Sequence, residues 1–354
     1  MEKVGVAVIG TGLLGARHAR VYTEIPNAQL VAVADIQAER AKAVADKHGA
    51  AWYTDYHELL KNPAVQAVSV ATPDHLHRDA VVACLQAGKH VLTEKPLATQ
   101  MADAEAMLQA ARGTGLTFMV NFSQRFVPEY AWIKRMVEAG TIGTPLMVQS
   151  LKHDQMSVPT DMIRSWSSKT SPIFFMTSHD MDLIHWYLGS DPVEVTAYAT
   201  SRVLLQAGFA TTDGIQAVTR YAGGETVLYH SSWVHPATFP TLTDSYLEIL
   251  GSKGVIYLCS RNRQAEIYSE TLNQIITFEG PHTANEVGGV LRGAFRGSLE
   301  LFLHSIMTGE EPMTSAVNTL PVAALEFALH DSFGNGRPVR VSEYLDPLKQ
   351  AALR

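Results

Sequence analysis

Cysteine is scarce in this sequence: Cys84 and Cys259 are the only two among 354 residues, and they lie far apart. Such a pair supports neither a disulfide framework nor a cysteine metal site, so a reduced compartment is expected. Basic runs and acidic tails are absent and the net charge is −7, which argues against nucleic acid or an anionic membrane surface as a partner. No apolar run approaches the roughly 18 residues of a membrane span, and the first strand leaves no room for a signal peptide. We therefore expect a soluble, cytoplasmic protein.

The composition is that of a globular protein with more than one core. Hydrophobic residues make up 46% of the chain and charged residues 18%, which is ordinary for a soluble protein. A chain of 354 residues exceeds the size at which a single core stops growing, so two domains are predicted.

Strands and helices alternate in the first third of the chain. The predicted strands are short and mostly apolar, as a sheet covered on both faces requires, and lie at 4–9, 30–34, 67–71, 90–93 and 117–121. Predicted helices lie at 14–22, 38–48, 56–61, 77–87 and 101–113. Alternating βα units build a doubly wound parallel sheet. Residues 1–122 are thus predicted to form an α/β domain.

The pattern changes after Asn121. A helix is predicted at 123–140 and a strand at 146–152, and from residue 193 strands with period-2 alternation dominate, at 193–201, 214–221, 225–234, 246–251, 254–259 and 264–269. Helices return at 297–308 and 317–333. This pattern predicts an α+β domain over 123–354, with a large, mostly antiparallel open sheet.

The first strand runs directly into a glycine-rich turn. The turn reads Gly10-Thr11-Gly12-Leu13-Leu14-Gly15, a G-x-G-x-x-G pattern followed by a helical segment. Only glycine permits so tight a turn and a close approach of the backbone to a pyrophosphate, which binds the N–H groups at the helix N-terminus. Asp35 ends the next strand about 20 residues on, where a carboxylate accepts hydrogen bonds from a ribose 2′-OH. The first domain is therefore predicted to be a dinucleotide-binding Rossmann domain.

Asp35 also bears on which dinucleotide binds. A carboxylate at this position repels a 2′-phosphate and no arginine directly follows it, so the prediction is NAD rather than NADP. The cofactor of such a sheet lies beyond the carboxyl ends of the strands. The further cofactor-binding residues predicted there are Ala71, Thr72, Pro73, His77, Glu94, Lys95 and Asn121.

Several motifs together resemble the Gfo/Idh/MocA family of sugar and polyol dehydrogenases. They are the glycine turn, Thr72-Pro73-Asp74-His75-Leu76-His77, Glu94-Lys95-Pro96, Gln124-Arg125-Phe126 and His179-Asp180-Met181-Asp182 with Trp186 and Gly189. The resemblance covers nearly the whole chain. It implies a Rossmann domain followed by an open-faced sheet for substrate binding and, commonly, oligomerisation. A homo-oligomer, either a dimer or a tetramer, is accordingly expected.

Lys95 is the first candidate for catalysis. It lies at a strand end near the expected nicotinamide, where burial and the positive ring favour the neutral amine. Such an amine can exchange a proton with a hydroxyl or bind the substrate oxygen. Pro96 restricts Lys95 to extended geometry, and the resemblance implies an unusual peptide bond between them. The alternative is a surface lysine in a turn.

His179 is the second catalytic candidate. The family pattern Asp-x-x-x-His-x-x-Asp at a helix start implies a place for His179 at the reacting hydroxyl, with Asp182 one turn later to orient the imidazole. The position four before His179 is Phe175 rather than aspartate. This departure removes one acid and makes the pocket drier, so Lys95 and His179 are left to share the proton. Asp182 is equally suited to a hydrogen bond at a helix terminus or in the core.

Four more residues are candidates for substrate binding. Lys152 and His153 leave the first strand of the second domain, and Arg164 and Trp166 lie in an irregular stretch, 161–171, which has the features of a lid with an aromatic side chain for a sugar face. A surface loop with a partly buried tryptophan explains that stretch equally well. His75 and His77 are two residues apart, but no cysteine or carboxylate set completes a site, so no metal is predicted.

The predicted function is an NAD-dependent dehydrogenase that acts on a sugar or cyclic polyol, with Lys95 and His179 handling the proton. Two alternatives stay open. A glycosidase that uses tightly held NAD to oxidise, eliminate and re-reduce shares these motifs but generates no net NADH. A non-catalytic, NAD-sensing binding protein is compatible with Phe175, although the presence of Lys95 argues against it.

Overall fold

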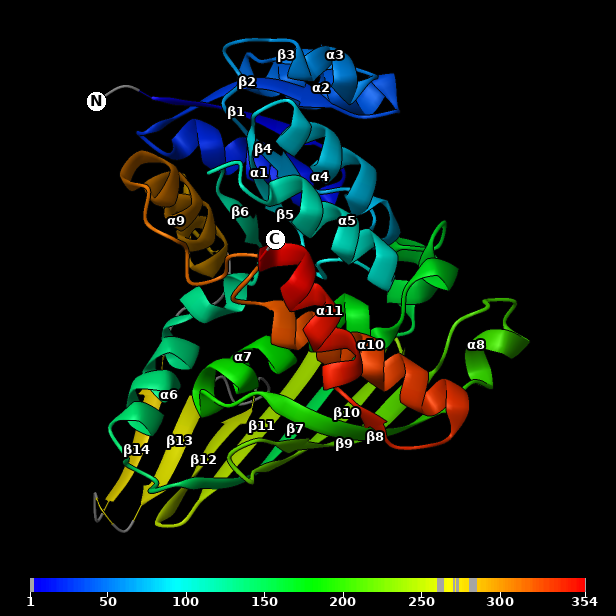
Figure 1. Ribbon diagram of the computed structural model, residues 1–354, viewed down its shortest axis with the longest axis vertical. Helices are drawn as coiled ribbons and strands as arrows, with labels where there is room; N and C mark the ends of the chain where they lie inside the picture. Colours follow the sequence, from blue (N-terminus) through cyan, green and yellow to red (C-terminus); the bar gives the residue numbers. More distant parts are fainter. Residues whose placement is uncertain (1–2, 260–263, 270, 272–273, 280–284, 354) are drawn as a thin grey trace. The chain divides into compact units, whose positions relative to one another are not determined.

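The computed structural model describes residues 3–259, 264–269, 271, 274–279 and 285–353, and the chain divides into two compact units (Figure 1). The first unit takes in Met1–Phe126, His282–Leu320 and Pro347–Arg354. The second takes in Val127–Pro281 and Pro321–Asp346. Residues 282–320 and 347–354, which the sequence analysis places in the second domain, thus group with the first unit.

A parallel sheet forms the centre of the first unit. Its described strands run in the order β3-β2-β1-β4-β5-β6, and every neighbouring pair is parallel. The strands are β1 (Val4–Ile9), β2 (Ala28–Ala34), β3 (Ala51–Tyr53), β4 (Ala67–Val70), β5 (His90–Thr93) and β6 (Phe118–Val120). The helices are α1 (Leu13–Glu24), α2 (Ala38–His48), α3 (Tyr56–Leu60), the 3₁₀ turn η1 (Asp74–Leu76), α4 (His77–Gln86) and α5 (Met101–Ala111). The predicted doubly wound sheet is confirmed. Strand β3 was not predicted, because three residues are too few to show an apolar pattern.

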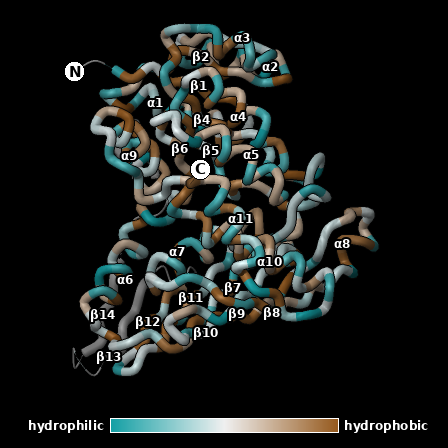
Figure 2. Tube along the Cα trace, viewed as in Figure 1, coloured by the Kyte–Doolittle hydropathy of each residue, from teal (hydrophilic) through white to brown (hydrophobic). Residues whose placement is uncertain are grey.

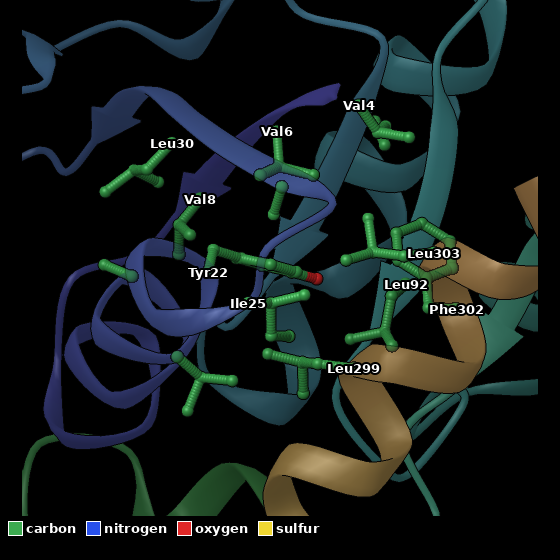
Figure 3. Packing of buried hydrophobic residues seen from close by; sticks show 14 of the residues in the cluster. Val4, Val6, Val8, Tyr22, Ile25, Leu30, Leu92, Leu299, Phe302 and Leu303 are labelled. Atoms are coloured by element: carbon green, nitrogen blue, oxygen red, sulfur yellow. The ribbon is translucent and has the colours of Figure 1, made fainter. Parts of the chain in front are cut away.

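The core of this unit is completed by a helix from much later in the sequence. Residues Leu299, Phe302 and Leu303 of α9 (Ala294–Thr308) pack in one cluster with Val6 of β1 and Tyr22 of α1 (Figure 3). Each fully buried side chain of this size contributes about 2 kcal/mol of transfer free energy. The hairpin of β15 (Asn285–Val287) and β16 (Val290–Arg292) precedes α9. The first unit therefore depends on residues outside the continuous segment 1–122.

The second unit is built on a mixed sheet. Its described strands run in the order β14-β13-β12-β11-β7-β10-β9-β8-β17, with all pairs antiparallel except β7 with β10. The strands are β7 (Pro145–Gln155), β8 (Pro192–Thr200), β9 (Gly214–Tyr221), β10 (Thr226–His235), β11 (Thr243–Gly251), β12 (Gly254–Cys259), β13 (Gln264–Ser269), β14 (Gln274–Glu279) and β17 (Val339–Arg340). The prediction of a mostly antiparallel sheet is confirmed.

Helical segments of several kinds accompany this sheet. They are α6 (Pro128–Glu138), the π-helical turn η3 (Val158–Met162), the 3₁₀ turn η4 (Ser167–Lys169), the π-helical turn η5 (Ile173–Thr177), α7 (Ser178–Leu188), α8 (Val203–Gln206) and α10 (Leu320–Asn335). Helix α11 (Ser342–Leu353) begins in this unit, and its residues from Pro347 on group with the first unit. The single helix predicted at 123–140 is wrong. A 3₁₀ turn, η2 (Ser123–Phe126), ends before Pro128, which starts α6. Proline disfavours a helical residue before it but suits the first position of a helix.

One face of the second sheet is covered and the other is open. The backbone N–H of Ala197 in β8 donates to Oγ of Ser332 in α10, and α10 is hydrophobic along most of its length (Figure 2). Residues that alternate with the buried ones point to the opposite face, where Tyr198 and Val218 are 69% and 50% exposed. A membrane-spanning segment is not found among the described helices.

Candidate functional site

The glycine turn has the shape that a pyrophosphate requires. Gly10 has a φ of +87°, and a Cβ there would lie 2.6 Å from the carbonyl oxygen of Ala71. A Cβ on Gly15 would lie 1.7 Å from the carbonyl oxygen of Gly10, whereas a Cβ on Gly12 would meet nothing within 4 Å. Gly12 is also the N-cap of α1 and provides no side-chain cap. The turn therefore leaves space and N–H groups for an anion at the helix N-terminus, and Leu13 and Leu14 in its first turn are exposed.

Asp35 is bonded to the glycine turn itself. Its Oδ2 accepts hydrogen bonds from the backbone N–H of Thr11 at 2.8 Å and from the Thr11 hydroxyl at 3.1 Å, and its Oδ1 accepts from the N–H of Gln37. The carboxylate thus holds the end of β2 against the turn and places a negative charge there. Ile36 beside it is 88% exposed. Sequence reasoning passed over Ile36, although an isolated apolar residue after the acidic strand end is suited to contact an adenine ring.

The turn after β4 contains a buried hydroxyl for which no hydrogen-bond partner is found among the described residues, Oγ1 of Thr72. Ala71 and Pro73 beside it are partly exposed. The ring of His77 lies between two backbone carbonyls, with Nδ1 3.0 Å from the oxygen of Pro96 and Nε2 3.1 Å from the oxygen of Thr72. His77 thereby joins this turn to the segment after β5.

Lys95 is buried, with 9% of its surface exposed, two residues beyond the end of β5. The peptide bond between Lys95 and Pro96 is cis, in line with the unusual bond that the resemblance implies. Lys95 therefore lies at the carboxyl edge of the parallel sheet, the edge that also carries Gly10, Asp35 and Thr72. A surface lysine in a turn would be far more exposed.

Glu94 lies in a buried polar group of side chains. Its Oε1 accepts from Nδ2 of Asn121 at 2.6 Å and lies 2.9 Å from Nε2 of His18. Burial raises the pKa of Glu94, but the hydrogen bonds from His18 and Asn121 and the charge of Lys95 outweigh it, so the pKa lies below its ordinary value. Oδ1 of Asn121 accepts from the hydroxyl of Ser298 in α9. Sequence reasoning did not single out His18 or Ser298, because their contacts join distant segments.

In the second unit, His179 is the second residue of α7 and is partly buried. Asp182, one turn later, is fully buried. The aspartate between them was not predicted to take part: Asp180 accepts from Nζ of Lys152 at 2.5 Å and from the hydroxyl of Ser150 at 2.7 Å. The structure thus brings Lys152 of β7 to the start of the helix that carries His179.

Lys152 and His153 face opposite sides of the second sheet. Successive residues of a strand point to opposite faces, and Lys152 is on the helix-covered face. His153 instead packs against His230 and His235 of β10, with ring centroids 4.7 and 4.8 Å away. The two residues predicted as neighbours in one substrate site are therefore separated by the sheet.

Aromatic side chains gather near the start of α7. The ring of Phe175 lies 6.0 Å from that of Trp166 and 6.2 Å from that of Trp233. The guanidinium of the exposed Arg164 lies 5.6 Å from the ring centre of Phe209. The stretch 161–171 is thus less irregular than predicted, because η3 overlaps its start and η4 lies inside it. Trp166 is partly buried, a position that suits either a core contact or a sugar face.

The residues of the first unit fit NAD. An open approach at Gly12, a buried hydroxyl at Thr72 and a carboxylate at Asp35 match the pyrophosphate and ribose of a dinucleotide. A negative charge at Asp35 opposes a 2′-phosphate. Among the described residues, no cluster of three or more histidine, cysteine, aspartate or glutamate side chains is arranged to hold a metal ion.

Comparison with known proteins agrees with these features. Residues 4–122 match the model of an oxidoreductase family with an NAD-binding Rossmann fold, and residues 130–257 match the GFO/IDH/MocA C-terminal domain. A myo-inositol 2-dehydrogenase from Thermotoga maritima is 29% identical over 96% of this chain and 99% of its own. An NAD⁺-dependent scyllo-inositol 2-dehydrogenase from Bacillus subtilis is 28% identical over 96% and 97%.

Solved structures share the same fold. An oxidoreductase from Agrobacterium radiobacter, solved with NAD⁺, L-tartaric acid and magnesium, superposes with a TM-score of 0.84. It is 22% identical and covers 96% of this chain and 99% of its own. With both domains matched, the chain belongs to the Gfo/Idh/MocA family of NAD-binding oxidoreductases.

Proposed function

We propose that this enzyme moves a hydride between NAD and a secondary alcohol of a cyclic polyol or sugar, with an inositol as the leading substrate. The observation that carries the proposal is the burial of Lys95 at the carboxyl edge of the parallel sheet, the edge of the glycine turn. The relatives that align over nearly their whole length are named inositol 2-dehydrogenases, which supports the substrate class.

The chain's own residues handle the proton. Bound NAD supplies the hydride acceptor. Oxidation of an alcohol also releases the hydroxyl proton, which requires a base within hydrogen-bond reach. The amine of Lys95 takes that proton and returns it when the reaction runs as a reduction. Burial keeps the amine away from water, so the proton passes between the amine and the substrate rather than to solvent.

His179 provides the second contact with the reacting hydroxyl, and Asp182 orients its ring. Lys152 is an unsuitable base because its charge is matched by Asp180 at 2.5 Å. We assign Lys152 and Asp180 instead to hold the start of α7 and to hydrogen-bond substrate hydroxyls. We assign Trp166 and Arg164 to contact the ring of the sugar. His153 is the weakest substrate candidate, because it faces away from Lys152.

The test is substrate-dependent formation of NADH by the purified protein with myo-inositol, scyllo-inositol, hexoses and anhydrosugars. Lys95→Ala should lower kcat about 10³-fold, the usual size of general acid–base catalysis, while NAD still binds. Lys89→Ala is the matched control, since Nζ of Lys89 bonds only the carbonyl of Val65 among the described residues. Release of an aryl leaving group without NADH would instead identify a glycosidase, and NAD binding with neither activity would identify a binding protein.

We also propose that the open face of the second sheet binds a second copy of this chain. Strand register places Thr196, Val218 and Leu228 in one row across β8, β9 and β10, and Tyr198 and Met147 are more than half exposed. Apolar residues gathered on one open face favour an interface. Sedimentation should give a dimer or tetramer of the 38.7 kDa chain, and Val218→Glu should weaken it. A monomer at assay concentrations would refute this assembly.

A further inference from the structure

The buried polar side chains behind Glu94 form a continuous hydrogen-bonded chain. The hydroxyl of Tyr22 lies 2.7 Å from Oγ of Ser69, which lies 3.2 Å from Nδ1 of His18. Nε2 of His18 then reaches Oε1 of Glu94 at 2.9 Å. One assignment gives each group an acceptor: Tyr22 donates to Ser69, Ser69 donates to His18, and His18 donates to Glu94. The chain therefore ends on the carboxylate next to Lys95.

This hydrogen-bonded chain is buried beside the apolar core of the first unit. Tyr22, His18 and Ser69 are 0% exposed, and the His18 ring meets the ring of Phe295 edge-on at 4.9 Å. Burying polar groups costs free energy unless every group is hydrogen-bonded, and a buried carboxylate costs most. Well-packed apolar side chains in place of buried polar pairs are often neutral or stabilising. The chain thus calls for a reason beyond packing, and its end at Glu94 supplies one.

We propose that His18 is a positioning residue for Lys95, which it serves by holding Glu94 ionised and in place. The proposal rests on the proposed function only in that Lys95 is the reacting amine. An ionised Glu94 favours the protonated form of the neighbouring amine and fixes the end of β5 from which that amine projects. His18 comes from α1, the helix that begins at the glycine turn, so one side chain ties the nucleotide turn to Lys95.

The first test measures the Lys95 amine directly. The wild type, His18→Leu and Glu94→Gln are treated with acetic anhydride over a range of pH, and acetylation of Lys95 is followed by mass spectrometry. Loss of the neighbouring negative charge in Glu94→Gln should move the pH of half-maximal labelling down by about one unit. His18→Leu removes the hydrogen bond that holds Glu94 ionised and in place, so it should move the midpoint in the same direction. His18→Gln, which keeps a side-chain N–H donor, should restore the wild-type midpoint.

The second test measures turnover. The rising limb of the kcat/KM profile should move to lower pH in His18→Leu and Glu94→Gln, and kcat should fall about tenfold because the amine is less well placed. The KM for NAD should change little. Because the two residues act as a unit, the double variant should be no worse than Glu94→Gln alone.

Ser332→Ala is the control for general loss of stability. Ser332 is fully buried, accepts from Ala197 and donates to the carbonyl of Arg337, all in the second unit. It should lower Tm without moving the Lys95 midpoint. A His18→Leu variant that only lowers Tm, with labelling and pH profile unchanged, would overturn the proposal. The near-isosteric Glu94→Gln keeps the test decisive if His18→Leu does not fold. A shifted midpoint in a protein that oxidises no polyol would refute the proposed function but not this inference.

Discussion

Two regions of the molecule hold their candidate residues by different means. The first is the nucleotide edge, which comprises Gly10–Gly15, Asp35, Thr72 and Lys95. The second is the helix-covered face of the second sheet, with Lys152, Phe175, His179 and Asp180. At the nucleotide edge, the shape of the backbone fixes the positions of the candidate residues, through glycines without room for a Cβ and an aspartate bonded to backbone N–H groups. On the helix-covered face, contacts between side chains fix these positions, namely a buried ion pair and a set of aromatic rings. The first arrangement is encoded by short motifs, whereas the second needs segments that meet only in the folded chain.

The largest expected effect comes from the ion pair on the helix-covered face. Asp180→Asn leaves the ammonium of Lys152 without its carboxylate in a site where both side chains are nearly buried. Breaking a buried pair from one side typically costs about 3–5 kcal/mol, so the free energy of unfolding should fall by about that much in a denaturant titration. Asp46→Asn, which breaks the exposed pair with Lys42, should change little. Equal losses in both variants would refute the special place of Asp180.

The matching change at the nucleotide edge is Gly15→Ala. Its Cβ would overlap the carbonyl of Gly10, so the turn must move. Strain of this kind costs about 1–3 kcal/mol, which corresponds to NAD binding weakened up to about 100-fold, measured by calorimetry. Gly49→Ala is the matched control, because Gly49 has a positive φ but open space around it and lies away from the turn. NAD affinity unchanged in Gly15→Ala would count against the assigned pyrophosphate position.

These two changes also show what the sequence could reveal. Strands β1, β5, β9 and β12 were predicted to the residue, because their apolar patterns end at glycine or polar turns. Lys95 was chosen as a candidate because it follows such a strand. The partner of Lys152 was missed: helical spacing pointed to Asp182 as a partner for His179, whereas Asp180 is the residue that meets β7. His18 was missed for the same reason, since its partner Glu94 lies on another strand.

A smaller effect is expected in the pH dependence of stability, and it arises where α10 packs against η5. Burial lowers the pKa of His330 from 6.5 to about 4, and its ring stacks on Phe174 at 4.1 Å. Because the folded pKa is depressed, the unfolded chain binds more protons between pH 6.5 and 4, and stability falls as the pH falls through that window. From pH 7 to 5 the loss should be at most about 2 kcal/mol, less if solvent reaches the ring edge. His330→Leu should lose this part of the pH dependence; an unchanged acid slope would contradict it.

The smallest expected effect returns to the nucleotide edge. If Asp35 binds the ribose as predicted, Asp35→Ala removes hydrogen bonds to the ribose and the charge that opposes a 2′-phosphate, so affinity for NAD should fall about tenfold while affinity for NADP falls less or rises. Fluorescence titration with both dinucleotides measures the ratio. The hydrogen bonds from Thr11 also disappear, so Thr11→Val, which removes only the hydroxyl contact, separates loosening of the turn from loss of the ribose contact. A preference that stays the same in Asp35→Ala would refute the ribose assignment.

The most direct test of the account is a crystal structure of the protein with NAD⁺ and an inositol that it oxidises, or a slowly reacting analogue. The account predicts that Nζ of Lys95 lies about 3 Å from the oxygen of the hydroxyl that loses its proton, within hydrogen-bond reach. A complex in which another side chain occupies that position, with Nζ of Lys95 directed away from the substrate, would contradict it.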